Sequence, residues 1–209
     1  MTEQNLSLRK KYNTYNSKRL KNRSFSLIAS NCNGGCILHD LGLPFNSPFV
    51  NLWMKPVDFI KFCKRMDYYL SQKMMFVTED NISYPIGQLD DIRLYFQHYT
   101  DNKSAEEAWV RRSARINRDN LFILGTDRDG CTYDDIRAFD QLPFENKIIF
   151  CHKRYPEFKS AFFIPGFEKQ KEVGLCMHFT NDKTYRKYYD AFDYVAWFNG
   201  KKHFLRRWF

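Results

Sequence analysis

The stretch Phe25-Ser-Leu-Ile-Ala-Ser-Asn-Cys-Asn-Gly-Gly-Cys36 decides the fold class, because a short apolar run passes directly into polar residues and paired glycines. Residues 25–29 predict a buried strand. Gly34 and Gly35 permit a sharp turn and a close approach of the backbone to a ligand, and residues 36–41 predict a short helix. Such a connection can hold an anion or a developing oxyanion, although a tight strand-to-helix turn without chemistry fits the pattern equally well.

A second unit of this kind lies in the middle of the chain. Residues 121–124 predict a buried strand, residues 126–130 a turn, Thr132 the N-cap of a helix that runs to Leu142, and residues 147–151 another strand. Together with the first strand, this pattern predicts an α/β protein with a three-layer α/β/α Rossmann-like fold and a mostly parallel sheet. Ligands of such sheets bind beyond the carboxyl ends of the strands.

The remaining chain predicts further elements around this sheet. The expected strands are residues 49–53, 74–77, 84–87, 92–98, 161–164 and 173–179, and the expected helices are residues 56–70, a helix that starts at Ser104, and residues 184–198.

Length and charge limit the organisation of the chain. The 209 residues, 44% of them hydrophobic, predict a single domain over residues 24–198. Residues 1–23 predict a basic segment that is flexible or loosely helical, and residues 199–209 predict a basic and aromatic tail. These two ends hold the net charge of +9. The tail is typical of peripheral contact with an anionic membrane, but a solvated tail is an equal alternative. Nucleic-acid motifs are absent, so no nucleic-acid partner is expected.

The location is expected to be the cytoplasm, at most peripheral to the inner face of the membrane. No apolar run approaches the roughly 20 residues that span a bilayer, and the N-terminal residues lack the pattern of a secretory signal. Most of the six cysteines are therefore expected to be free thiols.

Polar side chains follow several of the predicted strands. Because the carboxyl ends of parallel strands meet at one edge of a sheet, these side chains are expected to converge there. They are Asn31, Cys32, Asp127, Asp129 and His152.

Two charged patterns have both a functional and a structural interpretation. Arg111, Arg115 and Arg118 share one face of the helix that starts at Ser104, and they could clamp a phosphate or form a solvated face. Asp127 and Asp129 could hold a divalent ion or belong to a charged turn. The first expectation is that the protein binds no metal.

Six blocks of the sequence resemble a bacterial family. The blocks are Ser-Asn-Cys-x-Gly-Gly at 30–35, Asp-Leu-Gly-Leu-Pro at 40–44, Asp-Phe-Ile-Lys-Phe at 58–62, Tyr-Pro-Ile-Gly at 84–87, Trp-x-Arg-Arg with Arg-Ile-Asn within 109–117, and Asp-Arg-Asp-Gly-Cys-Thr at 127–132. They are similar to a family named as a domain of unknown function, whose members are often labelled exopolysaccharide or capsular polysaccharide biosynthesis proteins. The resemblance implies a Rossmann-like fold and a role in surface-glycan assembly.

The family pattern differs from this chain at two positions. It usually reads Ser-Asn-Asn-Cys-Trp-Gly-Gly, so its serine falls on Ala29 and its tryptophan on Asn33. This difference weakens a serine nucleophile.

The leading hypothesis is an acyltransferase, with O-acetyl transfer favoured, that modifies a sugar of a polysaccharide or lipid-linked glycan precursor. Acetyl-CoA would be the donor, and no tightly bound cofactor is expected. The expected roles are Cys32 or, second, Ser30 as nucleophile, His152 or His98 as general base, Asp127 as its orienting carboxylate, and the loop residues Asn31, Asn33, Gly34 and Gly35 as oxyanion and ligand site.

Two alternatives from other functional classes remain open. The first is a glycosyl- or phosphosugar-transferase that uses a nucleotide sugar and a divalent metal at Asp127 and Asp129. The second is a non-catalytic assembly factor for polysaccharide synthesis. The sequence leaves the oligomeric state and the strand order undetermined.

Overall fold

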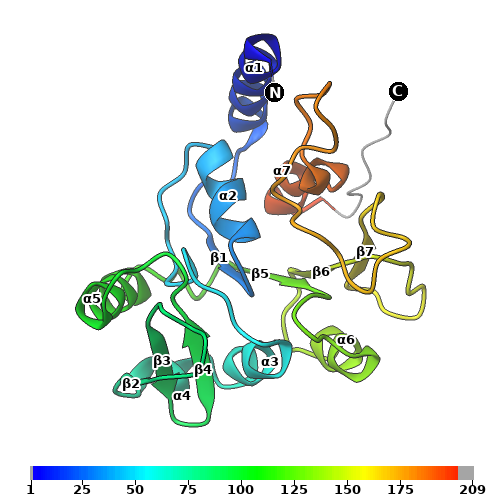
Figure 1. The fold of residues 1–209 in the computed structure, drawn as a ribbon. Coiled ribbons are helices and arrows are strands. Elements are labelled where there is room, and N and C mark those ends of the chain that lie inside the picture. Colours follow the sequence, from blue (N-terminus) through cyan, green and yellow to red (C-terminus); the bar gives the residue numbers. More distant parts are fainter. Residues whose placement is uncertain (1, 202–209) are drawn as a thin grey trace.

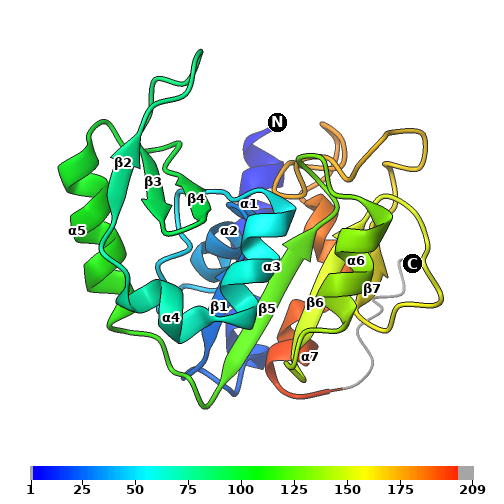
Figure 2. The same ribbon diagram turned by 90° about the horizontal axis from the view of Figure 1, so that it is seen from below.

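A four-stranded parallel sheet forms the centre of the structure, a computed structural model that describes residues 2–201. Its strands are β1 (Ser26–Ala29), β5 (Leu121–Thr126), β6 (Lys147–Cys151) and β7 (Ala161–Phe163), in the spatial order β1-β5-β6-β7. Because all four strands are parallel, their carboxyl ends share one edge, which lies at the top of Figure 2. The predicted α/β class and parallel sheet are confirmed.

Helices cover both faces of this sheet (Figure 1). Alternate side chains of each strand point to opposite faces, so each face builds its own core. Ile28 and Ile123 join the core beneath α3 (Pro56–Lys64) and α6 (Tyr133–Asp140). The other core contains Leu27 and Phe122 beside α2 (Asn33–Asp40) and α7 (Tyr194–Phe198). The three-layer arrangement is therefore confirmed.

A small antiparallel sheet lies within the long connection from β1 to β5. Its strands are β2 (Met75–Val77), β3 (Ile86–Leu89) and β4 (Ile92–Tyr95), and it is flanked by α4 (Met66–Ser71) and α5 (Asn102–Ser113). Figure 2 shows this sheet and α5 beside the central sheet.

Several predicted elements are shorter than expected or irregular. The helix expected over residues 56–70 breaks at Arg65, whose φ of −135° and ψ of 44° are not helical. The strand expected over residues 49–53 is reduced to one bridge between Trp53 and Tyr95, and residues 173–179 form no strand. The closing helix expected over residues 184–198 is divided between the 3-10 turn η1 (Tyr188–Ala191) and α7.

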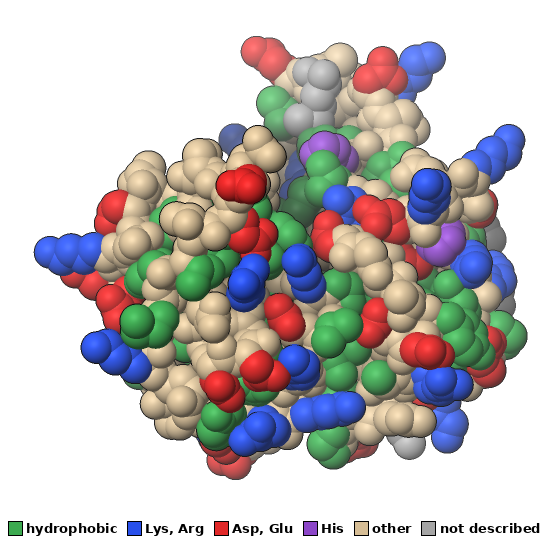
Figure 3. All heavy atoms as spheres, turned by 60° about the horizontal axis from the view of Figure 1, so that its bottom comes forward, with side chains coloured by type: hydrophobic (Ala, Val, Ile, Leu, Met, Phe, Trp, Pro, Cys, Tyr) green, Lys and Arg blue, Asp and Glu red, His purple; other side chains and the backbone are tan. Residues whose placement is uncertain are grey.

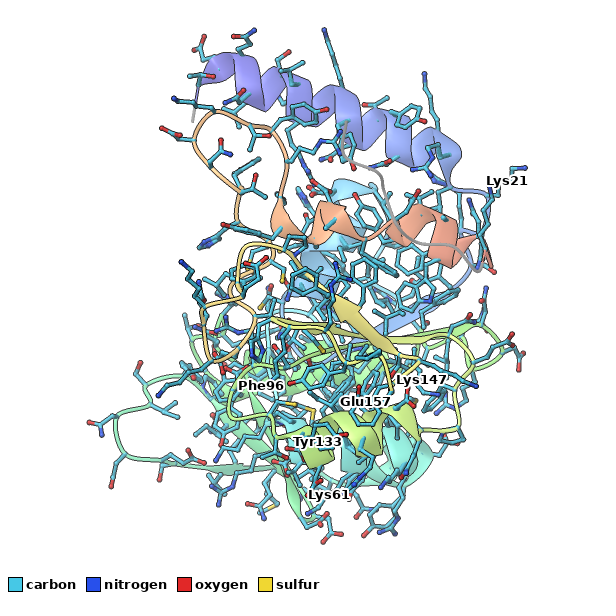
Figure 4. All side chains as sticks on the ribbon, turned by 90° about the vertical axis from the view of Figure 1, so that its right-hand side faces the viewer. Lys21, Lys61, Phe96, Tyr133, Lys147 and Glu157 are labelled. Carbon is cyan, nitrogen blue, oxygen red and sulfur yellow. The ribbon has the colours of Figure 1, made fainter. Side chains whose placement is uncertain are left out.

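The N-terminal residues differ most from the sequence prediction. Instead of a flexible or loosely helical segment, the chain forms α1 (Glu3–Arg19), which lies as an outer layer across η1 and α7 (Figure 4). Polar contacts hold α1 in place: the buried Arg9 donates hydrogen bonds to Asp40 of α2 and Asp190 of η1. The domain boundary predicted at residue 24 would therefore separate Arg9 from the two carboxylates with which it forms ion pairs.

Two further predictions concern the ends of the chain and the membrane. Residues 202–209, which make up nearly all of the predicted basic and aromatic tail, lie outside the described residues. Among residues 2–201, no helix combines the length and the apolar character that crossing a membrane requires.

Replacing Arg9 with alanine is expected to destabilise the protein by about 3–5 kcal/mol, because two buried carboxylates lose their shared cation. Chemical denaturation followed by circular dichroism measures this loss. Arg137→Ala is the matched control, since it breaks an exposed pair with Asp134 and an exposed contact with the Tyr133 ring and should cost less than about 1 kcal/mol. Equal losses for the two variants would contradict the structural role of Arg9.

Asp40 should make stability depend on pH in the acid range. Burial alone would raise its pKa, but Arg9, with hydrogen bonds from Tyr189 and Lys187, lowers the pKa from 3.8 to about 2. A carboxyl group with a lowered pKa stabilises the fold above its ordinary pKa, and this stabilisation is lost as the pH falls from about 4 to about 2. Asp40→Asn should therefore be less stable than the natural protein at about pH 6, and the difference should shrink by about pH 3. Denaturation curves at both pH values test this, and a constant difference would refute it.

Candidate functional site

A pocket of about 540 Å³ opens at the carboxyl edge of the central sheet. Asn31 and Cys32 line it from the connection between β1 and α2, and Asn33 from the first residue of α2. His98 lines it from the chain after β4, and Asp129 from the turn after β5. Of the side chains predicted to converge, Asn31, Cys32 and Asp129 are thus brought together from two distant segments, and His98 joins them from a third. The volume lies within the range of roughly 300–1,000 Å³ that is typical of small-molecule sites.

Asn31 connects the loop after β1 to the neighbouring strand β5. Its Nδ2 donates a hydrogen bond of 2.8 Å to Oγ1 of Thr126, the last residue of β5. Its Oδ1 accepts a hydrogen bond of 3.2 Å from the backbone N–H of Asn33. The loop that enters α2 is therefore held to the neighbouring strand.

The paired glycines have a different role from the one predicted. Gly34 and Gly35 belong to α2, neither has a positive φ, and neither lines the pocket. A Cβ on Gly34 would lie 2.4 Å from the Cβ of Ala29, closer than packed atoms allow. Gly34 therefore lets α2 approach β1. The sequence predicted that Gly34 and Gly35 contact a ligand, but neither glycine lines the pocket.

Cys32 lines the pocket but lacks the surroundings of an activated thiol. Burial, together with the neighbouring Cys36, raises the pKa of its thiol. Sγ lies 4.0 Å from the carbonyl oxygen of Leu52. Since the thiolate is the nucleophilic form, a raised pKa makes Cys32 less reactive at neutral pH than a free cysteine.

Asp127 and His152 form the predicted pair, but they do so beside the pocket rather than in its lining. Nδ1 of His152 lies 2.5 Å from Oδ2 of Asp127, which also accepts the backbone N–H of His152 at 2.8 Å. Oδ1 of Asp127 accepts the backbone N–H of Val173 at 2.7 Å. The buried carboxylate therefore links β5, β6 and the segment after β7.

These contacts also disfavour a metal held by Asp127 and Asp129. Both oxygens of Asp127 already accept N–H groups, while Asp129 is exposed in the turn with a φ of 61°. In the described part of the chain, no three His, Cys, Asp or Glu side chains are grouped so as to hold a metal ion.

Ser30 faces a second, smaller cavity. This cavity adjoins the pocket, because Arg128 and Asp129 line both, and its other walls include Phe59 and Phe139. The buried Ser30 Oγ has no hydrogen-bond partner among residues 2–201. Ser30 is therefore separated from the residues that were expected to activate it.

The predicted arginine face does not exist. The helix α5 ends at Ser113, so Arg115 and Arg118 lie beyond it. The backbone N–H of Asn117 donates to Ser26 Oγ, which places this segment at the amino end of β1, opposite the pocket. Arg118 pairs there with Asp67, and Arg111 is exposed in the last turn of α5. The three arginines therefore cannot form a common phosphate clamp.

The arginine that does line the pocket is Arg128. Its Nη1 donates a 3.1 Å hydrogen bond to the carbonyl oxygen of Val173, and its Nη2 lies 4.0 Å from Asp129 and 3.9 Å from Glu172. Its position directly after Asp127, in a turn that follows a predicted strand, is the sequence signal that could have identified it.

Five more lining residues were missed from the sequence, and two of them, Leu175 and Met177, belong to the segment after β7. Trp53, Tyr84 and Gln97 reach the pocket from the small antiparallel sheet and its connections. Their positions depend on long-range pairing, for which no local pattern exists.

Asp127→Ala is expected to reduce the free energy of unfolding by roughly 2–5 kcal/mol, because buried N–H groups of His152 and Val173 lose their acceptor. Thermal and chemical unfolding measure the effect. Asp129→Asn is the matched control: asparagine tolerates the positive φ at this exposed position, so the change should stay within about 0.5 kcal/mol. A neutral Asp127→Ala would show that this carboxylate does not hold the edge of the sheet together.

Comparison with known proteins places the chain among its relatives. A family model described as a domain of unknown function, DUF1919, matches residues 3–199. A protein of Haemophilus influenzae, described as an uncharacterized protein, is 52% identical over 182 residues, which are 87% of this chain and 87% of that protein. The match includes α1 and the whole central sheet. The chain therefore belongs to the DUF1919 family.

Proposed function

We propose that the protein is an acyltransferase that transfers an acetyl group from acetyl-CoA to a sugar hydroxyl during capsular or exopolysaccharide synthesis. The observation that supports this most is the common pocket of His98, Arg128 and the Asn31–Asn33 loop. A base, a cation and a polar loop at one site are the groups that acyl transfer to a hydroxyl requires. The resemblance to polysaccharide biosynthesis proteins supports the sugar acceptor.

His98 is the general base of this proposal. Unlike His152, whose Nδ1 is bonded to Asp127, His98 is exposed and lines the pocket. It would remove the proton of the sugar hydroxyl while the hydroxyl oxygen attacks the thioester carbonyl. The new C–O bond replaces the C–S bond, and the departing CoA thiolate takes up a proton. Arg128 would stabilise the negative charge that develops on the carbonyl oxygen.

Cys32 has no covalent role in this scheme. Its thiol has a raised pKa and contacts a carbonyl oxygen, so direct transfer between donor and acceptor suits the pocket better than an acyl-cysteine intermediate. Cys32 is then part of the wall of the pocket.

His98→Gln is expected to lower acyl transfer by about 10²- to 10⁴-fold, the usual contribution of a general base. Cys32→Ala is the comparison variant and should retain activity within a few-fold. The readout is the O-acetyl content of the surface glycan in cells that contain only the variant gene, with thermal unfolding as the check on folding. Full acetylation with His98→Gln, or its loss with Cys32→Ala, would reject the proposed roles, and unchanged acetylation after deletion of the gene would reject the function.

A second proposal is transfer of a glycosyl or phosphosugar group from a nucleotide sugar. The position of Arg128 and Asp129 in the pocket favours it, because the arginine could contact a phosphate. Stabilisation by a nucleotide sugar with Mg²⁺ or Mn²⁺, but not by acetyl-CoA, would support this function over acyl transfer.

We further propose that α1 places the protein against an anionic membrane. Lys10, Lys11 and Lys18 are exposed along the outer side of this helix, where each could be attracted to acidic lipids. The same surface would serve a non-catalytic assembly factor. Retained function after simultaneous replacement of His98 and Arg128, but not after replacement of the three lysines, would favour that role.

A further inference from the structure

Trp53 is held rigidly at the wall of the pocket. Its backbone pairs with Tyr95 through hydrogen bonds of 3.0 and 2.9 Å, and its indole stacks on the Tyr95 ring at 4.1 Å with an interplanar angle of 12°. Its Nε1 donates a 3.3 Å hydrogen bond to the hydroxyl of Tyr84. Tyr95 covers one face of the indole, and Trp53 is half-buried and lines the pocket.

We infer that Trp53 is the platform on which a pyranose ring of the substrate lies. A pyranose has an apolar C–H face, which is favourably buried on a flat aromatic surface, and hydroxyl groups at its rim that require hydrogen-bond partners. Asn33, Gln97 and Asp129 line the same pocket and supply amide and carboxylate groups for them. The inference deepens the proposed function and rests on it for the identity of the reaction, but sugar binding can be measured without any acyl donor.

Asn33 gives independent support for a ligand with hydroxyl donors. This residue is 2% exposed, its backbone N–H is bonded to Asn31, and its Oδ1 has no hydrogen-bond partner within residues 2–201. A buried acceptor without a partner is unfavourable. A ligand hydroxyl that donates to this amide, after a rotation of the side chain, would remove that cost.

The charge of the pocket favours a neutral ring over a nucleotide. Arg128 is the one arginine or lysine among the described residues of the lining, and Asp129 and Glu172 lie within 4.0 Å of it. No excess of positive charge is left for a diphosphate beside Trp53, so the diphosphate of acetyl-CoA in the proposed reaction would lie outside this part of the pocket. Figure 3 shows that basic and acidic side chains are also intermixed over the face of the molecule that it draws. The purine of a nucleotide could stack on Trp53, but the phosphates of that nucleotide would gain little electrostatic attraction.

The test is ligand-observed saturation-transfer NMR on the full chain, without acetyl-CoA. The probes are the methyl glycosides of glucose, galactose and N-acetylglucosamine, with adenosine as the flat aromatic competitor. At least one glycoside is expected to bind, with saturation of its ring C–H protons. Trp53→Ala should weaken this binding about tenfold or more, whereas Trp53→Phe should retain most of it.

Tyr133→Ala is the matched control, since it removes an exposed aromatic ring on α6 that does not line the pocket (Figure 4). Glycoside binding that is equal in Trp53→Ala and the natural protein would overturn the inference, as would binding of adenosine with no glycoside. If the protein binds a sugar through Trp53 but has no acyl-transfer activity, the proposed reaction is wrong and the sugar subsite is still supported.

Discussion

The buried carboxylate of Asp127 is the constraint on which the edge of the sheet depends. A carboxylate that leaves water must recover its lost hydration through hydrogen bonds, and Asp127 does so with N–H groups of His152 and Val173. Those donors come from the end of β6 and from the chain beyond β7. One desolvated charge therefore fixes three segments relative to one another, and Arg128, the next residue, bonds to the same segment through Val173.

The pocket follows from this fixed edge and from a second link at Asn31. The hydrogen bond from Asn31 to Thr126 holds the start of α2 to β5, while the small antiparallel sheet brings Trp53 and His98 from the other side. A rigid polar edge facing a rigid aromatic wall is suited to orient two substrates, and orientation is a large part of what a transferase supplies. The Asp127–His152 pair resembles the acid and the base of a catalytic triad, but its hydrogen bonds hold together the segments at the edge of the sheet.

Local patterns predicted the central sheet, and long-range contacts explain where prediction stopped. The strands around residues 121–124 and 147–151 and the Thr132 cap were predictable because their signals lie within a few residues. The ordered helix α1 was not predictable, since it depends on hydrogen bonds from Arg9 to carboxylates of α2 and η1. The convergence of Asn31, Cys32 and Asp129 followed from the parallel sheet. The place of Trp53 in the pocket was missed, because it depends on pairing with Tyr95, and the predicted arginine face was wrong, because α5 ends at Ser113.

Site-specific alkylation of the cysteines tests the central claim, an open ligand pocket at the carboxyl edge, most directly. With iodoacetamide and mass spectrometry on the folded protein, Cys32 should react while the buried Cys63, Cys151 and Cys176 do not, and acetyl-CoA with a glycan acceptor should slow the reaction of Cys32. If Cys32 reacts no faster than the buried thiols, or at the same rate with and without these ligands, the pocket is not where they bind.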